Sequence, residues 1–96
     1  MTTTNKNDAN KSAVLEKLSA VRSALQNEPQ NAAVARALEQ CDRLELAITQ
    51  FHAEGLRFAA FTLQRMVFGQ GTAFTEPVRV ATQNLKSALE TAGYPH

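Results

Sequence analysis

The sequence is poor in the features that hold small proteins together covalently or anchor them in membranes. Cys41 is its one cysteine, which excludes an internal disulfide framework and agrees with a reducing compartment. The longest purely apolar runs, 32–35 and 58–61, have four residues each, whereas a transmembrane helix needs about 20. No basic-then-apolar leader stands at the N-terminus. We therefore expect a cytoplasmic protein, of a composition that suits a small bacterial protein, with no membrane partner.

An excess of charge of one sign is lacking too. Ten Lys and Arg residues against nine Asp and Glu residues give a net charge of +1, and the charges are scattered as single residues without a basic face for nucleic acid. His52 and His96 are the only histidines, and no ligand cluster or nucleophile–base pair accompanies them. We expect a non-enzymatic protein with no metal, no cofactor and no nucleic-acid partner.

What the sequence does contain is helical periodicity. Apolar residues that recur every three or four positions predict helices over about 10–27, 32–68 and 75–92. Residues 1–9 are almost all polar, so they are expected to form a disordered tail. Residues 10–96 are expected to form a single all-α domain.

Local signals mark the ends of these helices. Pro29 breaks the first pattern, and Asn31 or the residues around Pro29 can start the second. Thr75 is placed as the N-cap of the last helix, and Gly93 is placed to end it. Glu45 is expected to form a salt bridge with Lys17 or Arg22 of the first helix.

The middle segment, 32–68, is expected to be one long helix. Its three-and-four rhythm passes through Gly55 in phase, and no Ser, Thr, Asp, Asn or Pro stands at positions 55–58 to start a new helix. Two shorter helices would flank it, and a second copy of the chain would complete the bundle. The alternative is a monomeric up-down four-helix bundle in which the chain is split at Gly55.

The second half of this segment carries more apolar residues than the flanking helices can cover. On a helical wheel they spread over an arc of well over 200°, and a second chain is the simplest cover. The predicted interface residues are Phe51, Gly55, Leu56, Phe58, Phe61, Leu63, Met66, Val67 and Phe68. We thus expect an interaction or structural protein that forms a homodimer. A groove for another protein's helix is the alternative, whereas Glu54 and Arg57 argue against a membrane-surface role.

Two residues have reactive potential. The segment around His52 resembles in part the histidine phosphotransfer domains, which carry an exposed histidine on a bundle helix with a basic residue and a glycine shortly after it. The resemblance implies that His52 accepts a phosphoryl group, so phosphotransfer signalling is an alternative function. The segment departs from that pattern, because Gly55 follows one residue early and Glu54 would repel phosphate. Cys41 is predicted to be a core residue, with an interchain disulfide at a two-fold axis as the alternative.

Overall fold

The structure, a computed structural model, describes residues 6–50, 52–69 and 74–94. These residues form four helices and no strand, which confirms the all-α class. The helices are α1 (Lys6–Gln26), α2 (Ala32–Gln50), α3 (Ala53–Phe68) and α4 (Glu76–Ala92). The first helix begins at Lys6, four residues before its expected start, so residues 6–9 are helical and only 1–5 of the expected tail lie outside the described residues.

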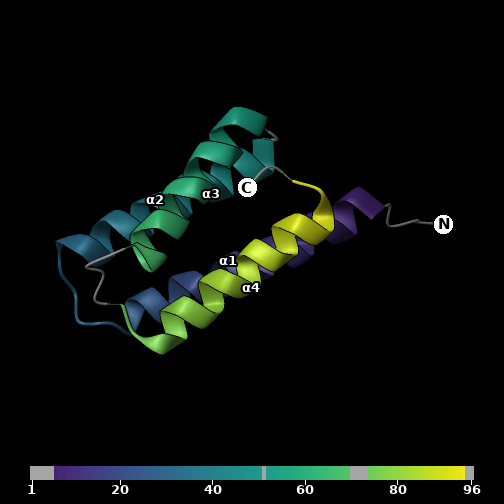
Figure 1. The fold of residues 1–96 in the computed structure, drawn as a ribbon. Helices are drawn as coiled ribbons and strands as arrows, with labels where there is room; N and C mark the ends of the chain where they lie inside the picture. Colours follow the sequence, from purple (N-terminus) through teal and green to yellow (C-terminus); the bar gives the residue numbers. More distant parts are fainter. Residues whose placement is uncertain (1–5, 51, 70–73, 95–96) are drawn as a thin grey trace.

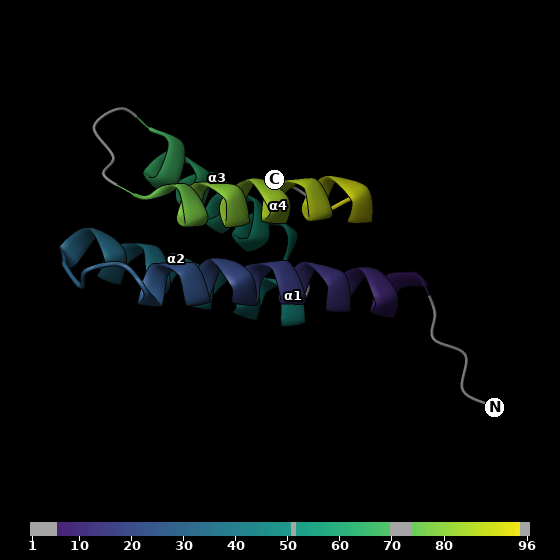
Figure 2. The ribbon, with the colours of Figure 1, turned by 90° about the horizontal axis from the view of Figure 1, so that it is seen from below.

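The four helices run alternately up and down the molecule (Figure 1). The closest pairings are α1 with α4 and α2 with α3, and α1 also packs along α2. Seen from below, α1 and α2 lie along one side of the molecule while α3 and α4 lie along the other (Figure 2). The described chain therefore fits the four-helix alternative, and it measures 48 × 24 × 18 Å along its principal axes.

The prediction of one continuous helix over 32–68 is wrong, because the chain turns back between Gln50 and Ala53. His52 is the N-cap of α3 and has an extended backbone, with φ −94° and ψ 98°. Its amide donates to the Ala47 carbonyl at 2.9 Å and closes α2, while its carbonyl accepts the Leu56 amide at 2.8 Å and opens α3. The split thus lies three residues before Gly55, which belongs to the first turn of α3.

The reason for the turn is burial within one chain. Folding back onto α2 lets α3 bury Leu56, Leu63 and Val67, each at most 1 % exposed. Burying each such side chain stabilises the fold by about 1.5–3 kcal/mol. That gain outweighs the few backbone hydrogen bonds that an unbroken helix would add, since each is worth only about 0.5–1.5 kcal/mol.

The end signals read from the sequence are confirmed at three of the helix ends. Asn31 Oδ1 accepts the Val34 amide at 2.9 Å at the start of α2. Thr75 is the N-cap of α4, with a proline in the first turn, although its side chain makes no capping hydrogen bond. Gly93 ends α4 in the left-handed conformation, with φ 77°, which a residue without Cβ adopts at no steric cost.

One hydrogen bond between distant segments could not be predicted from any local pattern in the sequence. Glu28, in the α1–α2 connection, is 9 % exposed, and its carboxylate accepts the Thr75 amide at 2.7 Å. The carboxylate also brings negative charge to the N-terminus of α4, where the helix dipole favours it. The Gln30 side chain donates to the Glu28 carbonyl at 2.8 Å and orders this connection. The contact fixes α4 against the α1–α2 hairpin.

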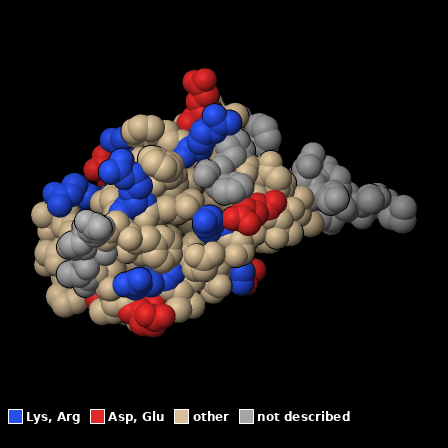
Figure 3. Space-filling view, viewed as in Figure 1, with Lys and Arg blue, Asp and Glu red and all other residues tan. Residues whose placement is uncertain are grey.

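Ion pairs lie on the surface. Arg22 contacts Asp42 at 2.9 Å and Glu45 at 2.7 Å, so the expected partner of Glu45 is Arg22, one of the two candidates. On the α3–α4 side of the molecule, basic and acidic side chains are interspersed with uncharged surface (Figure 3). Surface pairs of this kind contribute about 0–1 kcal/mol each, so the fold depends mainly on its apolar core.

Candidate functional site

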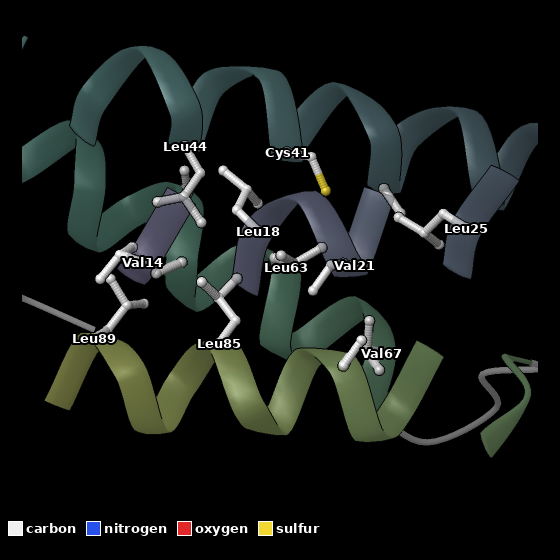
Figure 4. Close-up of a cluster of buried hydrophobic side chains, with 14 of the residues drawn as sticks. Val14, Leu18, Val21, Leu25, Cys41, Leu44, Leu63, Val67, Leu85 and Leu89 are labelled. Carbon is white, nitrogen blue, oxygen red and sulfur yellow. The ribbon is translucent and has the colours of Figure 1, made fainter. Parts of the chain in front are cut away.

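The third helix, α3, has two apolar faces, of which the inner one belongs to the core. Leu63 and Val67 lie among side chains of α1 and α4, such as Val21 and Leu85 (Figure 4). At most 2 % of any inner-face residue is exposed. The residues of this face are Leu56, Ala59, Ala60, Leu63 and Val67. The two alanines between larger residues leave room for neighbouring helices to approach closely.

The outer face of α3 is apolar as well, but none of the other described helices covers it. Phe58 is 64 % exposed, Phe61 51 % and Phe68 40 %. At about 100° per residue, these rings fall with Glu54 and Arg65 within an arc of about 80°, directly opposite the inner face. We call Glu54, Phe58, Phe61, Arg65 and Phe68 the outer stripe. It is the largest group of exposed phenylalanines among the described residues.

The chemistry of the outer stripe combines aromatic rings with charge. The Arg65 guanidinium carbon lies 5.7 Å from the centre of the Phe61 ring, within the range of a cation–π interaction. Two hollows adjoin the Phe58 and Phe61 rings. One is lined by Glu54, Arg57, Phe58 and Phe61, and the other by Phe58, Phe61, Thr62, Arg65 and Met66.

All the lining residues of these two hollows come from α3. A single helix cannot surround a small molecule, whereas typical ligand pockets bury about 70–90 % of their ligand. A convex helix face with protruding rings and shallow hollows beside them matches the surface of another helix. The outer stripe therefore has the shape of a protein-interaction surface.

The apolar surface continues from the end of α3 onto α4. Phe68 shares a third hollow with Arg79 and Val80 of α4, and Val80 is 48 % exposed. Leu46 is also 56 % exposed, but it lies on α2 in a hollow with Arg22 and Glu45. Leu46 is thus separate from the outer stripe and surrounded by charge.

The structure divides the residues predicted as an interface. Phe58, Phe61 and Phe68 lie on the outer stripe, and Gly55 is exposed in the first turn of α3, whereas Met66 is partly buried against the core. The prediction is corrected for three residues that lie in the chain's own core, Leu56, Leu63 and Val67. Phe51 lies outside the described residues. The wide apolar arc seen in the sequence is thus the sum of two faces, one already covered.

His52 is exposed, but it does not stand on a helix face. It caps α3 at the turn after α2, whereas the phosphotransfer domains that its segment resembles place the histidine within a helix. Glu54 is exposed two residues away in the first turn of the same helix. The geometry adds nothing to the partial resemblance.

Cys41 is fully buried in the core. Removal from water raises the pKa of its thiol from 9.0 to about 12, against the smaller opposing effect of Arg22. A neutral thiol at this depth is a small apolar core residue and a poor nucleophile. It lies too deep to form the interchain disulfide considered from the sequence.

Within 6–50, 52–69 and 74–94, no three His, Cys, Asp or Glu side chains are grouped so as to hold a metal ion. No helix in that part of the chain is long and apolar enough to cross a membrane.

Comparisons of the chain with protein-family models, with curated proteins and with solved structures find no match. The function is therefore inferred from the chemistry of the outer stripe.

Proposed function

We propose that the protein is a non-enzymatic helical interaction module that self-associates through the outer stripe of α3. The observation that carries this proposal is the exposure of Phe58 and Phe61 side by side on the helix face opposite the core. The core of the fold is buried without these two rings. Their exposure to water is unfavourable and does not stabilise the fold of a single chain. Contiguous exposed apolar surface of this kind marks interaction sites.

A second copy of the chain is the partner we favour. Most soluble homo-oligomers have closed symmetry, and two-fold dimers are the commonest. In such a dimer one stripe covers the other, so both sets of rings leave water together. No additional partner is needed to account for the exposed rings.

The exposed area sets the expected strength of the dimer. Taking about 200 Å² for a whole phenylalanine side chain, the three rings expose roughly 300 Å² per chain. Two stripes would bury about twice that area, plus their flanking residues, against about 1,200–2,000 Å² for a standard stable interface. We therefore expect a dimer of moderate affinity that dissociates on dilution.

Light scattering behind a size-exclusion column tests the proposal. At high concentration the mass should be twice the chain mass of 10.5 kDa, and it should fall towards 10.5 kDa on dilution. A monomer at every concentration from about 1 µM to about 1 mM would contradict self-association, because a dissociation constant above that range corresponds to less than about 4 kcal/mol of binding free energy.

A further inference from the structure

The part of the outer stripe from Glu54 to Arg65 is symmetric in its apolar residues and opposite in its charges. Phe58 and Phe61 stand at its centre, Glu54 precedes Phe58 by four residues, and Arg65 follows Phe61 by four. The midpoint of both pairs lies between Ala59 and Ala60. Reversing the direction of the helix therefore superposes ring on ring and exchanges acid for base.

We propose that two copies of the chain pack α3 against α3 in an antiparallel pair, with Glu54 of each copy beside the partner subunit's Arg65. This inference rests on the proposed function and gives it a geometry. The two-fold axis runs between the two helices, at the level of residues 59 and 60, so each Phe58 ring meets the partner subunit's Phe61. An interface of this kind uses the same patch on both copies.

Within one chain, Glu54 and Arg65 are too far apart to form an ion pair with each other. Arg65 lies eleven positions after Glu54, which is about 16 Å along the helix at ~1.5 Å per residue. Neither side chain makes an ion pair within the part of the chain that the structure describes. In the antiparallel pair both gain an oppositely charged neighbour.

The shape of the stripe agrees with this arrangement. The Phe58 and Phe61 rings have one hollow on the Glu54 side and another on the Arg65 side. The two-fold axis places the Glu54 hollow of one copy over the Arg65 hollow of the other. Rings that enter the hollows of a facing helix produce the interdigitation by which helices pack.

A parallel pair is disfavoured by the same charges. It would set Glu54 against the partner subunit's Glu54 and Arg65 against the partner subunit's Arg65. Like charges placed opposite each other across an interface weaken it and select against that register. The direction of the pair is thus encoded by two residues.

Charge exchange between two variants tests the geometry. Glu54→Arg creates two like-charge pairs in its own antiparallel homodimer, and Arg65→Glu does the same. We expect each variant alone to self-associate about tenfold or more weakly than the unaltered chain. Mixing the two variants converts both contacts into attractive pairs, so native mass spectrometry should show the heterodimer as the main dimer. The double variant E54R/R65E should regain the unaltered chain's affinity.

Glu16→Arg is the matched control, because it makes the same charge change at an exposed position of α1. Mixed with Arg65→Glu, it should produce no preferred heterodimer. Circular dichroism checks that every variant keeps its helices. If the unaltered chain dimerises but Glu54→Arg and Arg65→Glu do not select each other, the antiparallel pair is overturned while self-association stands. If the unaltered chain is a monomer at every concentration, the proposed function itself fails.

Discussion

Replacing Phe58 by alanine separates the stability of the fold from that of the dimer. Phe58 is 64 % exposed in a single chain, about 130 Å² of a side chain of ~200 Å². Two copies expose about 260 Å² at this position and alanine retains part of that area, so a two-fold dimer loses up to about 200 Å² of burial. At ~25 cal/mol per Å² this amounts to at most ~5 kcal/mol. We expect a loss of ~2–5 kcal/mol, which raises the dimer dissociation constant ~30-fold to several thousand-fold.

The assay has two readouts. Sedimentation velocity over a dilution series measures dimer dissociation for the Phe58→Ala variant and the unaltered chain. Urea unfolding, followed by circular dichroism at a concentration where the chain is monomeric, measures the fold. The free energy of unfolding should change by less than ~0.5 kcal/mol, because Phe58 is mostly in water in the monomer.

Two control variants bracket this result. Leu46→Ala removes a side chain that is 56 % exposed on α2, away from the outer stripe, and should leave the dimer unchanged. Leu63→Ala truncates the fully buried inner face of α3 and should lower the free energy of unfolding by ~2–5 kcal/mol. A dimer through the outer stripe is ruled out if Phe58→Ala leaves dimer dissociation unchanged, or if Leu46→Ala weakens the dimer as much as Phe58→Ala does.

Three further predictions concern the fold and are measured by urea unfolding. The Cys41 thiol ionises near pH 9.0 when the chain is unfolded but only near pH 12 in the core, so above pH 9 the unfolded state binds fewer protons than the folded state. The free energy of unfolding should therefore fall by up to ~1.4 kcal/mol per pH unit between pH 9 and pH 12. Cys41→Ala should remove that part of the pH dependence, and equal slopes for the variant and the unaltered chain would contradict this prediction. Glu28→Ala should cost ~1–3 kcal/mol, because the Thr75 amide loses its acceptor, and an unchanged urea midpoint would show that the contact contributes nothing. Gly93→Ala should destabilise by ~1–2 kcal/mol, since its φ is 77°. Gly55→Ala should stabilise by ~0.5–1 kcal/mol, since the added Cβ meets neighbours only at 3.7 Å and 3.8 Å; the opposite order of the two glycine variants would overturn this contrast.

Helix ends could be predicted from the sequence wherever a nearby residue supplies the signal. Asn31 caps α2 with its own side chain, and Gly93 adopts the left-handed conformation that ends α4. The end of α2 differs, because His52 caps α3 without a side-chain hydrogen bond. What decides this turn is the burial of α3 against other helices of the chain, which no local pattern reports.

The candidate site could be predicted from the sequence only in part, and the reason is related. The three-and-four rhythm passes through Gly55, whereas the buried face of α3 lies one residue further on, beginning at Leu56, and includes Ala59 and Ala60. Side-chain size does not indicate which face of α3 is buried, because the large phenylalanines face outward and the small alanines face inward. The contact of Glu28 with Thr75 spans 47 residues, and only the fold brings these residues together.

If a second chain covers the Phe58 and Phe61 rings, hydroxyl-radical footprinting measures this coverage residue by residue. The unaltered chain is oxidised well above and well below its dimer dissociation constant, and modification is quantified at Phe58, Phe61 and, as an exposed reference, Leu46. A dimer through the outer stripe should protect both phenylalanines strongly at high concentration only, with Leu46 equally reactive throughout. Equal reactivity of Phe58 and Phe61 at both concentrations would contradict it.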